Sequence, residues 1–380
     1  MILKVKKQKI INNLALLLLV LLLFSISFYQ IFGNLLFRYL IVLILILFSL
    51  YIKFFRLNKN GYLDYKIIIP WTIFILIILI SCVYNEGSLM PIIEYISILI
   101  LYFFLLQYII FDETIIFKSL ILNGNLILIY SVFINPLLGS PYSGFYRNTN
   151  TFGLQLCASF IACAFFLMNR NNIIIKIFLL LNDFVFLYFI YLSKSRSSLL
   201  ICVFCIFALL LFFIRGIGIS RKKFIFTFLF LTIIFGLLIL YFDEVYEFIY
   251  NIIFKYDTSS NDISSGRINK QAEALKYLTF IGNNEIAIHS FNDFLLTGQL
   301  YGYVAMIMHF VNCLNFLILG IRYYLQNKNY ESLFYLVIII SFFFLSFFEE
   351  IMGAFGLPLV VTMFISVGRI MFKQQSYYYN

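Results

Sequence analysis

The chain has few charged residues. Asp, Glu, Lys and Arg make up 12% of its 380 residues, against roughly a quarter in a soluble globular domain. Hydrophobic residues make up 63%, and the mean hydropathy is +1.00. This composition excludes an ordinary soluble domain and predicts an all-α protein that crosses a membrane many times.

Several kinds of functional site are also missing from the sequence. No glycine-rich P-loop is present, so no nucleotide is expected. The six cysteines lie in or beside apolar runs, and we interpret Cys202 and Cys205 as a core or lipid-facing pair. We therefore predict no disulfide framework, no metal site and no cofactor.

About twelve runs are long enough to cross the ~30 Å hydrocarbon core as helices of some 20 apolar residues. They lie at 10–29, 35–52, 67–84, 92–111, 115–134, 151–168, 173–192, 198–214, 224–242, 294–320, 331–348 and 354–371. The first run is longer than the apolar part of a signal peptide and no small-residue cleavage site follows it, so we expect an uncleaved helix.

The positive charges predict the orientation of the chain. If the N-terminus is cytoplasmic, 19 of the 27 Lys and Arg residues fall in cytoplasmic segments, as the positive-inside rule requires. Both termini are then cytoplasmic. The net charge of +10 is mostly this topological signal, so no nucleic-acid partner is expected. We predict one transmembrane domain over residues 1–380, with residues 243–293 as a large extracytoplasmic loop that contains short amphipathic helices.

Four polar islands fall on the predicted outer side, at residues 144–153, 193–198, 264–275 and 288–302. Three of them carry an arginine on a side that membrane proteins keep poor in positive charge. These are Arg147, Arg196 and Arg267. We expect them to bind an anionic group.

Two of the islands, 193–198 and 144–153, also have a simpler interpretation. Arg267 is predicted in the first turn of a helix capped by Ser264 or Ser265, where free N–H groups and a guanidinium suit phosphate oxygens. Lys194 and Arg196 instead fit a turn whose long side chains reach the membrane surface. Arg147, with Asn148 and Asn150, also fits an ordinary polar loop. These six polar residues are candidates for substrate binding or catalysis.

In this order, the islands resemble the O-antigen ligase and polysaccharide repeat-unit polymerase superfamily (Wzy/WaaL-like) over roughly residues 140–320. Residues 148–153 (NTNTFG) resemble the family's N-P-N-x-x-G stretch, with Thr in place of Pro. Residues 195–197 (SRS) match its S-R-[GS] turn. Residues 265–267 (SGR), followed by Ala274 and Leu275, match its S-G-R element with a later A-L.

The last family element, H-N-x-x-L followed by glycine, matches only in part. Asn292, Leu295 and Gly302 fit its spacing, but Phe291 stands where the family has histidine, and His289 lies two residues earlier. The resemblance implies His289 as general base, with a structural or interfacial histidine as the alternative.

Two acids and a second histidine complete the candidates. Asp293 and Glu285 are substitutes for His289 as base, and Asn292 and Asp293 are candidate substrate-binding residues. His309 is expected to pack or hydrogen-bond inside its predicted helix.

The resemblance implies a fold of the GT-C kind and a glycosyl transfer on the outer face of a bacterial cytoplasmic membrane. The donor would be an oligosaccharide linked to polyprenyl (undecaprenyl) diphosphate, and membrane lipid, a flippase and a chain-length regulator would be partners. His289, Arg267 and Arg196 would be catalytic. We favour a polymerase of capsule or O-antigen repeat units. The alternatives are a ligase that transfers the finished polysaccharide to another acceptor, and a lipid-linked oligosaccharide flippase. A flippase would be expected to have two similar halves and charged residues inside the bundle, but no internal repeat is apparent and only Asp183 is a clear mid-helix acid in the first nine predicted spans.

Overall fold

A computed structural model describes residues 2–28, 35–55, 64–110, 112–136, 138–216, 267–285, 288–351 and 357–374. These residues are 81% helical and contain no strand. The predicted all-α class is therefore confirmed for the described part of the chain.

Nine helical stretches among the described residues are long and apolar enough to span a membrane. The helices are α1 (Ile2–Ser27), α3 (Leu35–Phe55), α4 (Tyr65–Tyr84), α5 (Met90–Ser97) with η1 (Ile98–Phe104) and η2 (Leu105–Tyr108), α6 (Thr114–Ile134), α7 (Thr149–Met168), α8 (Ile173–Leu192), α9 (Arg196–Gly216), α12 (Arg267–Ala274) with η3 (Leu275–Tyr277), α13 (Asp293–Tyr301), α14 (Tyr303–Asn327), α15 (Tyr330–Leu345) and α16 (Pro358–Gln374). They indicate a multi-pass membrane protein.

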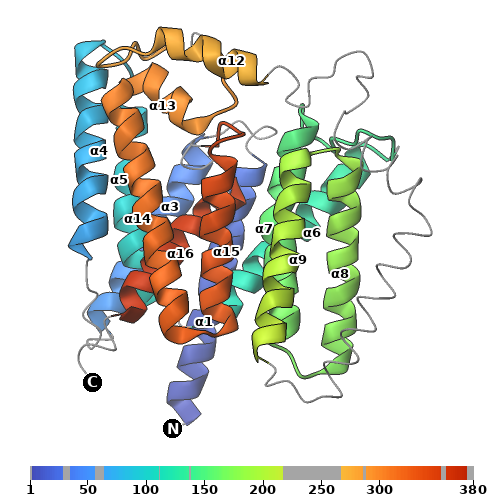
Figure 1. Cartoon of the computed structure of the whole chain (residues 1–380). Coiled ribbons are helices and arrows are strands. Elements are labelled where there is room, and N and C mark those ends of the chain that lie inside the picture. Colours follow the sequence, from blue (N-terminus) through green and yellow to red (C-terminus); the bar gives the residue numbers. More distant parts are fainter. Residues whose placement is uncertain are drawn as a thin grey trace.

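The helices alternate in direction between the two ends of one bundle (Figure 1). Helix α7 lies inside, with 83% of its apolar window buried, whereas only 22% of the α8 window is buried. Large apolar side chains of α8 therefore point away from the protein, among them Phe178 and Phe184. An exposed apolar helix face of this kind is expected where lipid replaces water.

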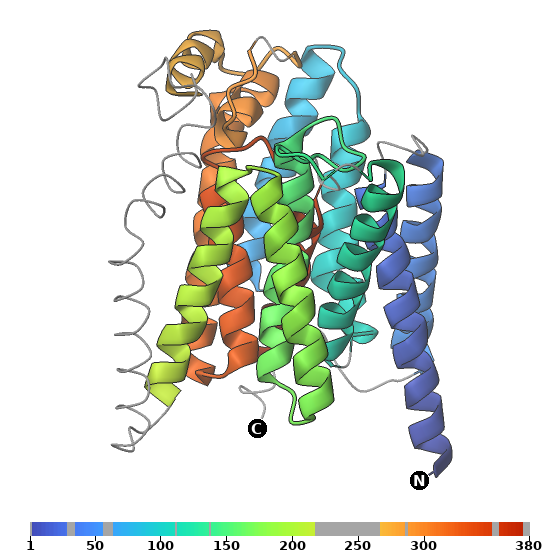
Figure 2. The same cartoon turned by 90° about the vertical axis from the view of Figure 1, so that its right-hand side faces the viewer.

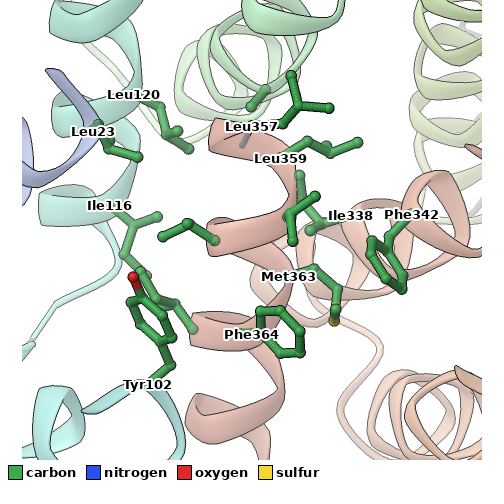
Figure 3. Packing of buried hydrophobic residues seen from close by; sticks show 14 of the residues in the cluster. Leu23, Tyr102, Ile116, Leu120, Ile338, Phe342, Leu357, Leu359, Met363 and Phe364 are labelled. Carbon is green, nitrogen blue, oxygen red and sulfur yellow. The ribbon is translucent and has the colours of Figure 1, made fainter. Parts of the chain in front are cut away.

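The core lies where α16 and the end of α15 meet α1, η1 and α6 (Figure 3). Tyr102, Met363 and Phe364 are buried there, and the rings of Tyr102 and Phe364 stack at 6.4 Å. Packing of this kind joins the N-terminal helices to the C-terminal pair, so the described helices form one bundle.

One predicted span is wrong. The apolar run 294–320 was expected to be a single helix, but it divides into α13 and α14 at Gly302, whose φ is 94°. A Cβ at Gly302 would lie 2.1 Å from the carbonyl oxygen of Phe280, and the N–H of Tyr303 donates to Thr279 O at 2.9 Å. The chain breaks here because segment 279–281 packs directly against its backbone.

The predicted span 224–242, the start of the loop 243–293 and Ser264 and Ser265 lie outside the described residues. Every other predicted span overlaps a described helix. Twelve spans remain a prediction.

The short helix of the outer loop differs from what its sequence pattern predicts. Helical spacing puts Ile268, Ala272, Leu275 and Leu278 on one apolar stripe, but Ile268 and Leu275 are exposed. Helix α12 ends at Ala274, which is the residue that it buries. The helix is too short to present the predicted stripe to the bundle.

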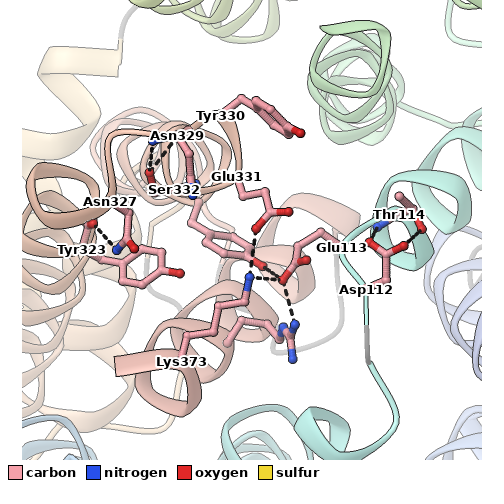
Figure 4. A network of polar contacts seen from close by, with 12 residues as sticks. Asp112, Glu113, Thr114, Tyr323, Asn327, Asn329, Tyr330, Glu331, Ser332 and Lys373 are labelled. Carbon is pink, nitrogen blue, oxygen red and sulfur yellow. Dashed lines mark hydrogen bonds and ion pairs between the residues drawn. The ribbon is translucent and has the colours of Figure 1, made fainter. Parts of the chain in front are cut away.

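A buried polar network closes the end of the bundle where α1 begins (Figures 1 and 4). Glu113, just before α6, accepts from Arg369 at 2.7 Å, from Tyr335 at 2.9 Å and from Lys373. Lys373 also pairs with Glu331 at 2.9 Å. Burial acts to raise the pKa of Glu113, but the two cations outweigh it and lower that pKa to about 2. The network ties α16 to the start of α6 and α15.

Candidate functional site at the polar end of the bundle

The turn after α15 carries two adjacent acids, Glu349 and Glu350, at the end of the bundle opposite to the start of α1 (Figures 1 and 2). Their side chains are only 10% and 18% exposed. A carboxylate removed from water needs donors or cations beside it. The partners of these two acids define the site.

Glu349 binds the arginine of the third island. Arg267 is the first residue of α12, and its Nη1 lies 3.0 Å from Glu349 Oε1 and also donates to Phe348 O. The guanidinium lies 4.9 Å from the ring centre of Phe291, and the ammonium of Lys270 lies 5.0 Å from the same centre. Two cations of α12 thus face one aromatic ring beside a carboxylate.

The same carboxylate oxygen reaches the second island. Ser197, in the first turn of α9, donates to Glu349 Oε1 at 2.9 Å. Arg196, the first residue of α9, is half-buried. Lys194 has a φ of 54° and lies with its ammonium 4.9 Å from the ring centre of Tyr191. The structure therefore brings islands 193–198 and 264–275 together through one glutamate.

The first island packs against the second. A Cβ on Gly153 of α7 would lie 2.7 Å from Ser193 Oγ and from Ser195 Cβ, so α7 approaches this turn closely. The N–H of Tyr142 donates to Leu192 O at 2.8 Å. All four islands gather at one end of the bundle. Arg147 of the first island is exposed, however, and no ion pair or hydrogen bond joins it to the described residues.

The two asparagines of the first island serve helix α7. Asn148 is its N-cap, and its side-chain oxygen accepts from the N–H of Asn150 at 2.8 Å. This contact satisfies a free N–H group of the first turn. Binding of a substrate by either residue stays a prediction.

Glu350 binds the fourth island. Its Oε2 lies 3.0 Å from His289 Nδ1, and its Oε1 accepts from the N–H of Phe291 at 3.1 Å and from Ser290 Oγ at 3.4 Å. The His289 side chain is 70% exposed. His289 belongs to an irregular segment that precedes α13, not to a helix, so its position two residues before the expected one does not turn it away from the site.

Phe291, at the position where the resembling family has histidine, has a φ of 51°. This left-handed conformation is uncommon for a bulky residue. It turns the backbone so that the N–H of Phe291 meets Glu350 and the ring meets Arg267. Phe291 therefore has a structural role between the two acids: its backbone contacts Glu350, and its ring contacts Arg267, the partner of Glu349.

The next two residues hold α13 in place. Asn292 is the N-cap, and its side chain accepts from the N–H of Leu295 at 3.0 Å and donates to Phe347 O at 3.3 Å. Asp293 is fully buried; its carboxylate lies 3.0 Å from His309 Nε2 and accepts from the N–H of Ile351 at 3.1 Å. His309 is buried within α14, as expected, but its hydrogen bond runs to Asp293 at the start of the separate helix α13.

These contacts join α13 to the turn 346–351, so Asn292 and Asp293 have a structural role. Asp293 has no exposed surface through which a sugar hydroxyl could reach it in this arrangement. Glu285, the other substitute base, is exposed, and no hydrogen bond or ion pair joins it to a described residue. His289 is therefore the better placed of the three candidate bases.

Sequence reasoning missed both Glu349 and Glu350. They follow the apolar run 331–348 directly and lie outside the four islands. The available signal was the adjacency of two acids at the end of a predicted span, in a chain with only 17 Asp and Glu residues. Acids at such a position require partners, and the partners are the predicted cations.

Among the described residues, no three His, Cys, Asp or Glu side chains gather as they would around a metal ion. The groups present are cations, two carboxylates, serine hydroxyls and one exposed imidazole. Such a set suits the binding of an anion next to a group that accepts a proton.

No protein-family model and no curated protein sequence matches this chain. The resemblance to the polymerase and ligase superfamily therefore stays a prediction.

Proposed function

We propose that the chain is a glycosyltransferase that polymerises oligosaccharide repeat units carried on polyprenyl diphosphate, on the outer face of a bacterial cytoplasmic membrane. One observation carries the proposal. Arg267, Ser197 and His289 come from three separate polar islands, and they meet at the adjacent acids Glu349 and Glu350. In a mostly apolar membrane protein, polar segments that are distant in sequence come together in this way at functional sites.

The cations fit the leaving group of this reaction. A sugar that leaves polyprenyl diphosphate transfers negative charge to the diphosphate as the anomeric C–O bond breaks. A fixed guanidinium stabilises that charge, and arginine contacts phosphate oxygens with two parallel N–H groups. In the proposal Arg267 is the principal phosphate-binding residue, with Arg196 at the start of α9 as the second and Arg147 as the third. Lys194 adds positive charge nearby.

The exposed imidazole fits the attacking group. The acceptor hydroxyl forms a bond to the anomeric carbon and gives up its proton as it does so. A neutral imidazole within hydrogen-bonding reach takes such a proton. His289 is exposed at the same turn to which Arg267 is anchored. In the proposal, the base and the phosphate-binding residue act on the two groups that the anomeric carbon exchanges.

The charge distribution supports the proposed location of the site on the outer side of the membrane. The cations of the site lie at the end of the bundle opposite to the start of α1. Under the positive-inside rule the start of α1, with Lys4, Lys6 and Lys7, is cytoplasmic, which puts the site outside. Lipid-linked repeat units displayed on the outer leaflet would have direct access to it.

The test is an incubation of the purified chain in detergent with the polyprenyl diphosphate-linked repeat unit of its own host, analysed as a gel ladder. We expect a ladder for the wild type and for Arg322→Ala, which removes an exposed arginine from the other end of α14. We expect none for Arg267→Ala. Transfer only when a second lipid acceptor is added would mean ligation, and no turnover with any acceptor would overturn the assignment as a transferase.

A further inference from the structure

The pair formed by His289 and Glu350 has the form of an imidazole held by a carboxylate. Nδ1 of His289 and Oε2 of Glu350 are 3.0 Å apart. An ionised carboxylate only accepts hydrogen bonds, so the imidazole nitrogen beside it must carry the proton. In a neutral imidazole the other nitrogen, Nε2, is then an acceptor.

The carboxylate is itself fixed. The N–H of Phe291 donates to Oε1 of Glu350, and the hydroxyl of Ser290, whose shorter hydrogen bond of 3.0 Å goes to Asn292 O, lies 3.4 Å from the same oxygen; Oε2 is left for His289. The Glu350 side chain is 18% exposed and the His289 side chain 70%. Glu350 is thus enclosed by its donors, and the imidazole is the part of the pair that a substrate can reach.

The neighbouring acid has a different partner. Glu349 binds Arg267 and Ser197, and Glu350 binds His289, so two adjacent glutamates serve two different groups. Neither the sequence motifs nor the resemblance assigns any role to Glu350.

We propose that Glu350 is a positioning residue that keeps the proton of His289 on Nδ1 and leaves Nε2 free to accept the proton of the acceptor hydroxyl. The catalytic half of this proposal rests on the proposed function; the tautomer does not. As the acceptor oxygen bonds to the anomeric carbon, its proton moves to Nε2. The electron pair of the broken C–O bond leaves with the lipid diphosphate, and the imidazolium, stabilised by Glu350, later releases the proton to water.

The tautomer can be measured without substrate. The chain has only two histidines, so ¹⁵N-histidine labelling gives two pairs of ring signals. In detergent at alkaline pH, where histidine is neutral, we expect His289 to show a protonated Nδ1 and an unprotonated Nε2. Substitution His289→Gln assigns its signals by their loss.

Two variants make the test specific. In Glu350→Gln the charge is lost, and we expect the Nδ1-protonated fraction of His289 to fall. In Glu349→Gln, which alters the adjacent acid, we expect no change at His289. The His309 signals, set by Asp293, serve as an internal check that the bundle is folded in every sample. A proton on Nε2 of His289 in the wild type would overturn the proposal.

Turnover then tests the catalytic half. Because general base catalysis contributes about 10²-fold to 10⁴-fold in rate, we expect His289→Gln to lower kcat on the order of 10²-fold or more. Glu350→Gln should lower kcat about tenfold or more, with KM for the donor little changed. Full activity of Glu350→Gln despite a changed tautomer would refute the positioning role. A wild type that has the expected tautomer but turns over no donor would refute the proposed function and leave the pair as a structural contact.

Discussion

Arg267 and Glu349 are 82 residues apart in the chain, and their side chains form an ion pair with Nη1 and Oε1 separated by 3.0 Å. The carboxylate is 10% exposed and the guanidinium 23%. The pair fastens α12 to the turn after α15. It also means that an anionic ligand of Arg267 has to compete with a carboxylate that is part of the protein.

Substitution Glu349→Gln should therefore strengthen binding of the lipid diphosphate donor. Removal of one negative charge a few ångströms from a bound anion is worth roughly 1 kcal/mol in a partly solvated site, which corresponds to a KM about fivefold lower. Steady-state kinetics with varied donor measure this. Glu273→Gln, which alters an exposed acid on the same helix, should leave KM unchanged. A higher KM in Glu349→Gln would show that Glu349 orients Arg267 for the donor and does not compete with it.

The buried pair of Asp293 and His309 should dominate the stability of this end of the bundle. Removal of one member of a buried, hydrogen-bonded pair costs about 3–5 kcal/mol, because its partner is left without a counterpart. Asp293→Ala also takes the acceptor away from the N–H of Ile351. We expect a clear fall in the thermal unfolding temperature in detergent. The double variant Asp293→Ala/His309→Gln should lose less stability than the sum of the losses in the two single variants. Strictly additive losses would contradict a direct coupling between the two residues.

The end of the bundle where α1 begins should lose stability in acid. The pKa of Glu113 is lowered to about 2 by Arg369 and Lys373, below the value of about 4.3 for an exposed glutamate. Its contribution is therefore fully present above the unfolded-state pKa and is lost as pH falls from about 4.3 towards 2. We expect Glu113→Gln to be less stable than the wild type at neutral pH, with the difference narrowing over that acid range. If the difference in the free energy of unfolding between the two proteins were the same at every pH, this would speak against an ionised Glu113.

Gly302 should tolerate no side chain. Its φ of 94° lies where residues other than glycine are strained, and a Cβ would collide with Phe280 O. We expect Gly302→Ala to destabilise the protein by more than about 2 kcal/mol and to reduce the yield of monodisperse protein in detergent. The control is Gly139→Ala, because nothing lies within 4 Å of a Cβ there. Similar melting temperatures for the two variants would show that the break between α13 and α14 is not held by Gly302.

Much of this architecture could be predicted from the sequence, because the bilayer imposes a simple rule on helix length and hydropathy. The turn at 193–198 and the start of α12 at Arg267 fall where polar residues interrupt apolar runs. The break at Gly302 could not be predicted, since it depends on the backbone of residues 279–281 packing against one glycine in an otherwise apolar run.

Only the basic residues of the site could be predicted from the sequence. Arg196, Arg267 and His289 are conspicuous as charged or titratable residues in polar islands on the predicted outer side. Glu349 and Glu350 are not, because their meaning depends on tertiary contacts with segments some 60 to 150 residues away. Asp293 was assigned to substrate binding from its place in a motif, and only the packing of α13 against α14 reveals that His309 is its partner.

The most direct test of the central claim is the rate of lipid diphosphate release from the donor by purified wild type, Arg267→Ala and Arg322→Ala, each verified as folded by size-exclusion chromatography. Loss of one electrostatic group of this kind costs about 10²-fold to 10³-fold in kcat. The account predicts a loss of that size in kcat/KM for Arg267→Ala and wild-type values for Arg322→Ala. Wild-type release by Arg267→Ala would contradict it, because the arginine bound to Glu349 would then have no part in handling the diphosphate.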